Sequence, residues 1–181
     1  MGIFNFKLPL LILTVACLAG CASGVQRAED TSKREAYFAK GGKLATEVTI
    51  SLTKEAQAMV PDNLKFDQDK LLATVKRALD AKNLLSKTAD PALPRIEILV
   101  TEIRVRSNVA AVLFGFMAGS DIIVGDVIAR DPSGKELQRF TVSASYALGG
   151  LGGGQDDARM GWLYETFAKH TIEELNGEKA D

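Results

Sequence analysis

Alternating hydrophobic and polar residues mark four stretches of the chain beyond residue 43. A period of two places one side of a strand inward and the other in water, so each stretch predicts a half-buried β-strand. Within the second stretch the alternation shifts near Thr101 and Glu102, which indicates a β-bulge. The sequence Asp-Pro-Ser-Gly at residues 131–134 predicts a tight turn between the last two stretches. The predicted strands are residues 44–52, 96–105, 121–130 and 135–146.

Apolar residues three and four positions apart predict two amphipathic helices. The first begins after Asp67, whose carboxylate suits an N-cap, and runs to about residue 85. The second spans residues 160–175 and ends at Asn176 and Gly177, a pair suited to a left-handed cap. The predicted order is therefore strand, helix, three strands, helix (βαβββα).

This order predicts an α+β fold, a small mixed sheet of about four strands with two helices packed on one face. The first two strands, separated by a helix, suit a parallel crossover. Composition agrees with one folded domain, because 46% of the 181 residues are apolar. The 22 basic and 23 acidic residues nearly cancel, which excludes the strongly basic surface of a general nucleic-acid binder.

The first 20 residues predict a secretory signal peptide, with Lys7 ahead of a short apolar run. That run is shorter than the roughly 20 residues that a membrane-spanning helix requires. It ends in Leu18, Ala19, Gly20 and Cys21, which resembles the lipobox of bacterial lipoproteins. The resemblance implies cleavage between Gly20 and Cys21 and a covalent lipid on Cys21. An ordinary export signal is the alternative.

Ala22, rather than aspartate, follows the lipobox, which implies sorting to the outer membrane, facing the periplasm. Residues 21–43 are polar and rich in small side chains, so we expect a lipidated flexible tether there and a single α+β domain over residues 44–181. Cys17 leaves with the signal peptide and Cys21 carries lipid, so no disulfide is expected within the mature chain.

An uncharged apolar run at residues 109–119 lies between two predicted strands and is the longest outside the signal. Apolar chain of this kind must be covered, because exposed in water it would promote aggregation. Three interpretations are open: a buried strand end or turn under the helices, a patch that contacts a protein partner or a second copy, and a tip that enters lipid. The candidate partner-binding residues are Phe114, Gly115, Phe116, Met117, Ala118 and Gly119.

Other polar motifs predict structural roles rather than chemistry. The glycine-rich residues 149–154 lack a nucleotide-binding spacing, so a hinge capped by Asp156 or Asp157 is expected. His170 has no second histidine as a metal-ligand companion, and we expect it to pack on the last helix. Arg104 and Arg106 are expected on a solvated strand face, with pairing to strand acids or to an anionic lipid headgroup as alternatives.

Acidic residues in the strand region do not have the spacing of a calcium-binding loop. They are Asp121, Asp126 and Asp131. We therefore expect no metal site, no catalytic set and no cofactor other than the covalent lipid.

Two short motifs follow one another in the sequence. They are Gly-Phe-Met-Ala-Gly at residues 115–119 and the Asp-Pro-Ser-Gly turn at residues 131–134. This arrangement is similar to a family of uncharacterised bacterial outer-membrane lipoproteins, in which a Gly-Phe-Gly-Ala-Gly-like loop precedes a hairpin with an Asp-x-x-Gly turn. Met117 replaces the central glycine of that pattern. The resemblance covers about the last 90 residues and implies a location and an architecture without an established activity.

These observations favour a lipid-anchored, non-catalytic binding or assembly-accessory protein, attached to the membrane through its lipid. The run at residues 109–119 is its expected contact with a protein partner or with a second copy. The alternative is a carrier or sensor of a small lipid or glycan, bound in a cleft between helices and sheet. The residues expected to line that cleft are Phe114, Phe116, Trp162 and Phe167.

Overall fold

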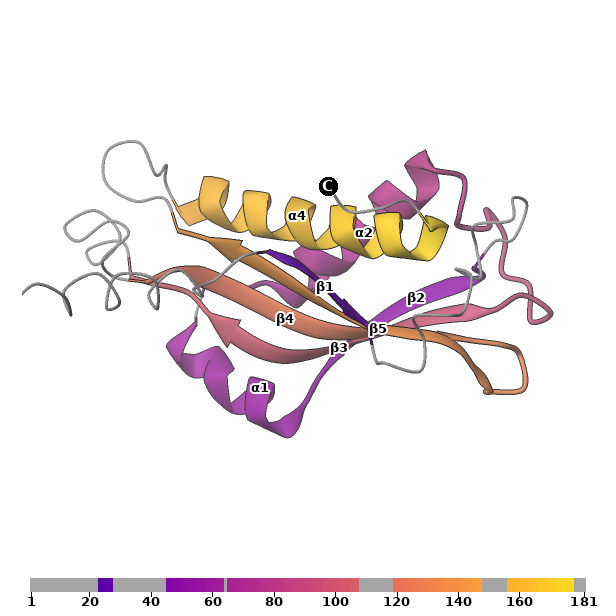
Figure 1. Ribbon diagram of the computed structural model, residues 1–181, viewed down its shortest axis with the longest axis horizontal. Coiled ribbons are helices and arrows are strands. Elements are labelled where there is room, and N and C mark those ends of the chain that lie inside the picture. Colours follow the sequence, from indigo (N-terminus) through magenta and orange to yellow (C-terminus); the bar gives the residue numbers. More distant parts are fainter. Residues whose placement is uncertain (1–22, 28–44, 64, 108–118, 148–155, 178–181) are drawn as a thin grey trace, which may run out of the picture.

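The structure is a computed structural model that describes residues 23–27, 45–63, 65–107, 119–147 and 156–177. Within these ranges, five strands form a single sheet in the order β1-β5-β4-β3-β2 (Figure 1). β2 pairs with β3 in parallel, whereas the other neighbours are antiparallel. The strands are β1 (Gly24–Arg27), β2 (Glu47–Leu52), β3 (Arg95–Arg104), β4 (Asp121–Arg130) and β5 (Glu136–Tyr146).

Helices cover both faces of the sheet, but unequally. The long helices α2 (Gln68–Ala81) and α4 (Asp156–Asn176) pack on each other and on one face. The short α1 (Lys54–Met59) lies on the opposite face against β3 and continues into the 3-10 helix η2 (Val60–Asp62) (Figure 1). The α+β class, the mixed sheet and the two helices on one face are confirmed, while the structure adds a fifth strand and a helix on the second face.

The central strands follow the sequence pattern closely. The register of β3 against β4 shifts between Val100 and Glu102, where a bulge is predicted. The β4–β5 turn closes with the Gly134 N–H donating to the Asp131 carbonyl at 3.0 Å. Gly134 has a φ of +90°, which a residue without a Cβ adopts at little cost.

The core lies between the sheet and the pair α2 and α4. Alternate residues of the strands and one stripe of each helix supply it, as the two periodicities require. Helix and sheet approach closely at Gly125 of β4, where an added Cβ would lie 3.2 Å from Phe167 Cζ. The fully buried large apolar side chains of the core include Leu71, Leu79, Ile96, Ile98, Ile123, Phe140, Leu163, Phe167 and Leu175.

At residues 24–27, strand β1 corrects the prediction of a flexible tether over residues 21–43, whose other residues except Ser23 lie outside the described ranges. Residues Gly24–Arg27 pair with β5 at the edge of the sheet, from Gly24 opposite Ser143 to Arg27 opposite Phe140. Arg27 also forms a bidentate ion pair with Glu174 of α4, which raises the pKa of the Arg27 guanidinium. The strand has only four residues, and its partners lie far away in the sequence, so local composition alone predicts a tether here.

Two helix boundaries also differ from the prediction. α1 begins after Thr53, whose hydroxyl accepts the Ala56 N–H, and its six residues are too few for a clear periodic signal. α2 ends at Ala81 instead of near residue 85, because Asn83 takes a φ of +54°. After the helix, Leu85 forms an isolated parallel bridge with Ala45. The regular part of the first predicted strand, β2, begins only at Glu47.

Candidate functional site

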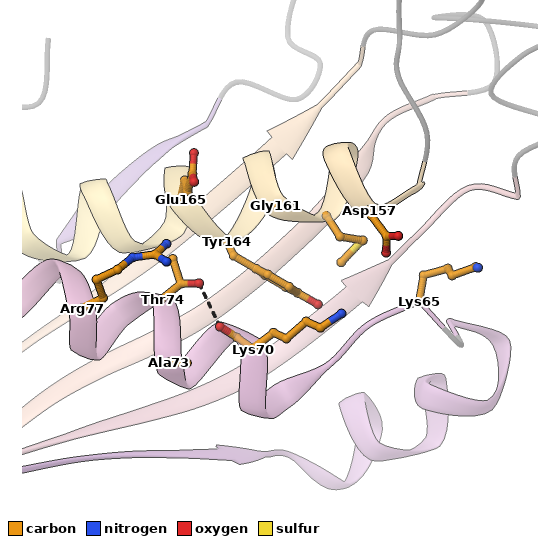
Figure 2. A pocket seen from close by; sticks show the side chains of 10 residues that line it. Lys65, Lys70, Ala73, Thr74, Arg77, Asp157, Gly161, Tyr164 and Glu165 are labelled. Atoms are coloured by element: carbon orange, nitrogen blue, oxygen red, sulfur yellow. Dashed lines mark hydrogen bonds between the residues drawn. The ribbon is translucent and has the colours of Figure 1, made fainter.

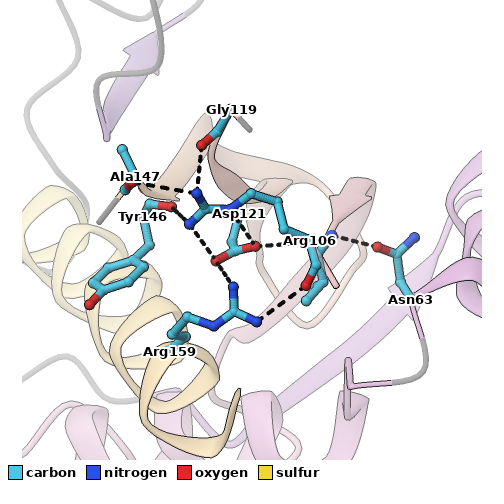
Figure 3. A network of polar contacts seen from close by, with 8 residues as sticks. Asn63, Arg106, Gly119, Asp121, Tyr146, Ala147 and Arg159 are labelled. Carbon is cyan, nitrogen blue, oxygen red and sulfur yellow. Dashed lines mark hydrogen bonds and ion pairs between the residues drawn. The ribbon is translucent and has the colours of Figure 1, made fainter. Parts of the chain in front are cut away.

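A buried polar network lies at one end of the sheet, where four elements meet (Figure 3). It joins the chain just after β3, the first residue of β4, the end of β5 and the first turns of α4. The two segments that connect these elements, 108–118 and 148–155, lie outside the described residues and begin and end at this network. We call it the loop-base network; its charged members are Arg106, Asp121 and Arg159.

Arg106 holds three of these chain ends together. Its Nη2 donates to Asp121 Oδ2 at 3.1 Å and to the Tyr146 carbonyl at 3.1 Å. Its Nη1 donates to the Gly119 carbonyl at 2.8 Å. Its backbone N–H donates to Asp121 Oδ1 at 2.7 Å, so the same carboxylate binds both the main chain and the side chain.

Arg159 ties α4 to the same carboxylate. Its Nη1 donates to Asp121 Oδ2 at 3.0 Å, and its Nη2 donates to the Arg106 carbonyl at 3.2 Å. The Asp121 side chain is 0% exposed, and those of Arg106 and Arg159 are 4% and 2% exposed. One buried carboxylate therefore serves two buried guanidinium groups, where low polarity strengthens each charge-assisted bond.

The position of Arg106 corrects the expectation of a solvated strand face. Arg106 is buried and pairs with the strand acid Asp121, which is the alternative interpretation, whereas Arg104 is exposed. Arg106 and Asp121 stand on either side of the apolar run in the sequence, and Arg159 follows the glycine-rich run. Nothing local marks them as partners, because only the folded sheet brings their three segments together.

An exposed aromatic pair lies beside the loop-base network. The ring of Trp162, on the second turn of α4, lies 5.0 Å from the ring of Tyr146, the last residue of β5. Trp162 is 42% exposed, and no other large apolar side chain in the described ranges is exposed. Tryptophan and tyrosine are enriched at protein and membrane interfaces, where an apolar ring body and a polar group each find a suitable environment.

The first described residue, Ser23, lies at the same end of the sheet. Ser23 Oγ donates to the Ser145 carbonyl at 3.2 Å and accepts the Ser145 N–H at 2.8 Å. Ser145 precedes Tyr146 of the aromatic pair. The chain therefore enters the domain next to the aromatic pair and the loop-base network.

The sequence-predicted sites fall mainly outside the described ranges. Gly20, Cys21 and five of the six loop residues (Phe114, Gly115, Phe116, Met117 and Ala118) lie there. Gly119 is described: it has a φ of +85°, and its carbonyl accepts from Arg106. Of the expected cleft residues that are described, Phe167 is fully buried in the core and Trp162 packs on Tyr146.

Three further predicted residues have defined surroundings. His170 is buried on α4, with Nδ1 3.4 Å from Glu173 Oε2. Asp126 accepts the Thr141 hydroxyl at 2.7 Å, and Asp131 accepts the Ser133 hydroxyl, a bond that lowers the pKa of Asp131. In the ranges that the structure describes, no three His, Cys, Asp or Glu side chains gather as a metal site. Nor is any helix there long and apolar enough to cross a bilayer.

Tyr164 of α4 lies at the base of a pocket between α2 and α4. Its hydroxyl oxygen accepts the Asp67 N–H at 2.7 Å at the start of α2, and its ring meets Phe66 edge-on at 6.3 Å. Burial is the main cause that raises the pKa of Tyr164 to about 12. The phenol therefore stays protonated in the folded protein well above the pH at which an exposed tyrosine ionises.

We expect alkaline pH to destabilise the domain through Tyr164. The folded-state pKa is the higher one, so the stabilisation is complete below pH 10 and is lost as pH rises towards about 12. By pH 12 the loss amounts to about 2 kcal/mol of unfolding free energy. Urea denaturation at pH 9 and pH 12 measures it, and Tyr164→Phe should lose about 2 kcal/mol less than the wild type. Equal losses in both proteins would contradict this assignment.

The fold and the loop-base network define a class: a one-sheet α+β domain whose buried charges hold loop ends together. The family model that matches residues 27–150 is described as a domain of unknown function (DUF4410), and the chain belongs to this family. The expectation of an uncharacterised family is thereby confirmed. No functionally curated protein matches the chain significantly.

Solved structures with the same fold include the PelC dodecamer from Paraburkholderia phytofirmans. It is 13% identical, with a TM-score of 0.50, over 88% of this chain and 100% of that chain. A variant of the same dodecamer is 12% identical, with a TM-score of 0.48, over 82% of this chain and 95% of that chain. At this identity the likeness concerns the fold alone.

Proposed function

We propose that this protein is a lipid-anchored, non-catalytic binding or assembly-accessory protein on the periplasmic face of the outer membrane. The lipid is carried by Cys21, and the end of the sheet around the loop-base network faces the membrane. Binding to a protein partner or to a second copy takes place through the segment at residues 109–119, which starts and ends at that network.

The observation that carries this proposal is the short chain between Cys21 and the folded domain. Ser23 is hydrogen-bonded to Ser145, and only two residue steps separate it from Cys21. Two fully extended residues reach about 7 Å at most. A lipid on Cys21 would therefore be attached no more than about 7 Å along the chain from Ser23, without a long tether in between.

The aromatic pair suits this placement. Tryptophan and tyrosine are enriched where membranes meet water, because each ring has an apolar body and a polar group. Trp162 is exposed, and its partner Tyr146 directly follows Ser145, to which the entering chain is bonded. The pair thus gives the anchored end a second membrane contact beside the lipid.

The loop-base network supports a binding role rather than a catalytic one. The Asp121 carboxylate accepts from Arg106, Arg159 and the Arg106 backbone N–H. These bonds fix the chain ends that meet at the network. Binding residues are commonly presented on loops that a rigid scaffold positions. Arg106 and Asp121, which flank the segment at residues 109–119 in the sequence, are both fixed in this network.

Site-specific photocrosslinking tests the binding role. A photoreactive amino acid replaces Phe116 in the full chain, in intact bacterial envelopes, and the same amino acid at Ser133 is the control. Ser133 is exposed in the β4–β5 turn, at the opposite end of the sheet. We expect a discrete crosslinked protein species from position 116 that position 133 does not give.

The identity of the crosslinked product separates the candidate functions. A second copy of the chain would indicate self-assembly, and the PelC neighbour is itself a dodecamer. A different protein would indicate an accessory role. Equal products from both positions, or a small lipid or glycan that copurifies and crosslinks to position 116, would contradict the proposal and favour the carrier alternative.

A further inference from the structure

A pocket of about 310 Å³ opens between α2 and α4 on the outer side of the helical layer (Figure 2). Ala73 of α2 and Gly161 of α4 line it, and side chains this small leave space between the two helices. A Cβ added at Gly161 would meet no atom within 4 Å. We call this space the interhelical pocket; none of its lining residues belongs to the loop-base network or to the aromatic pair.

The two walls of the interhelical pocket carry opposite charges. The α2 side contributes Lys70 and Arg77, with Lys65 from the turn that precedes the helix. The α4 side contributes Asp157 and Glu165. In Figure 2, Lys65, Lys70 and Asp157 lie towards the first turns of the helices, and Arg77 and Glu165 lie further along. Arg77 follows Lys70 by seven residues and Glu165 follows Asp157 by eight, which is about two helical turns in each case.

Hydroxyl groups complete the lining. Tyr164 Oη already accepts the Asp67 N–H, so its own proton can be donated to an acceptor on a ligand. The Thr74 hydroxyl donates to the Lys70 carbonyl at 2.9 Å, which leaves its lone pairs as acceptors. Donors for an anion and acceptors for a cation therefore line the same small space.

We propose that the interhelical pocket binds a small zwitterion in which a phosphate stands a few ångströms from an ammonium group, the chemistry of phosphoethanolamine. The phosphate lies against Lys65, Lys70 and the Tyr164 hydroxyl. The ammonium lies against the α4 wall at Asp157, whose carboxylate compensates its charge. A simple anion would leave Asp157 as a repulsive neighbour, and a simple cation would meet Lys65, Lys70 and Arg77 as like charges.

The size of the pocket agrees with a headgroup-sized ligand, since ligand sites begin at about 300 Å³. Such a group is found both as a free metabolite and at the surface of a lipid bilayer. The proposal does not depend on lipidation of Cys21, because none of the pocket residues takes part in anchoring.

Calorimetric titration of the full chain in detergent with O-phosphoethanolamine tests the proposal. Gly161→Leu fills the pocket from a helical position that leucine favours over glycine, so the fold is retained. Lys70→Ala removes a cation of the α2 wall. Lys76→Ala is the matched control, because Lys76 lies on the same helix but does not line the pocket.

We expect Gly161→Leu and Lys70→Ala to weaken binding at least about tenfold and Lys76→Ala to leave it unchanged. Inorganic phosphate and ethanolamine, titrated separately, should each bind at least about tenfold more weakly than the joined molecule. Equal affinity in Gly161→Leu and the wild type would overturn the site, and equal affinity for inorganic phosphate would overturn the zwitterion.

Vesicles distinguish the two sources of the ligand. Competition by phosphatidylethanolamine vesicles, but not by phosphatidylglycerol vesicles, assigns the pocket to a lipid headgroup. Binding of O-phosphoethanolamine that neither vesicle reduces assigns it to a soluble ligand. The titration with Cys21→Ser should give the same affinity as the wild type, so failure of this proposal and failure of the membrane anchor are separate results.

Discussion

Replacing Asp121 by asparagine is expected to lower the free energy of unfolding by about 3–5 kcal/mol, the cost of leaving a buried charge without its partner. Asparagine keeps the shape of the side chain but removes the charge that Arg106 and Arg159 share. Both guanidinium groups would remain buried and lose their carboxylate. Urea denaturation of the full chain measures the change.

Asp126→Asn is the control for this prediction. Asp126 lies on the same strand, and its carboxylate also meets an arginine, Arg139, at 3.7 Å. Its side chain is 28% exposed, and solvent-exposed pairs contribute about 1 kcal/mol or less. A loss for Asp121→Asn no greater than that for Asp126→Asn would contradict the role assigned to the loop-base network.

Changing Cys21 to serine is expected to move the protein from the membrane fraction to the soluble periplasmic fraction. Each buried methylene of an acyl chain contributes about 0.8 kcal/mol, so loss of several chains removes a lasting anchor. The aromatic pair alone has too little apolar surface to replace them. Fractionation of cells that express the full chain, followed by immunoblotting, measures the distribution.

Cys17→Ser is the matched control for Cys21→Ser. Cys17 belongs to the predicted signal peptide, which is removed before the cysteine of the lipobox. We therefore expect Cys17→Ser to remain in the membrane fraction like the wild type. Retention of Cys21→Ser in the membrane would contradict anchoring through this residue.

Local patterns in the sequence account for most of the central fold. The stripe of α4, the Asp67 cap of α2, the β4–β5 turn and the bulge near Thr101 each depend on neighbouring residues. Such features are set by periodicity, capping and turn chemistry, which act over a few residues. These features can therefore be predicted from the sequence alone.

Features that depend on distant partners could not be predicted in this way. β1 is a strand because it pairs with β5 more than 100 residues later, and Gly24–Arg27 has no strong strand signal of its own. The loop-base network joins Arg106 to Asp121 and Arg159 across two long connections. The interhelical pocket likewise requires the packing of α2 against α4, which composition does not specify.

The fluorescence of Trp162 tests the central claim most directly, because it is the single tryptophan of the chain. The lipidated full chain is reconstituted in vesicles whose acyl chains carry bromine, a short-range quencher, and is compared with plain vesicles. The proposed anchoring predicts strong quenching of Trp162 in the brominated vesicles and none for Cys21→Ser under the same conditions. Equal emission from membrane-bound protein in both kinds of vesicle would contradict an anchored sheet end held against the bilayer.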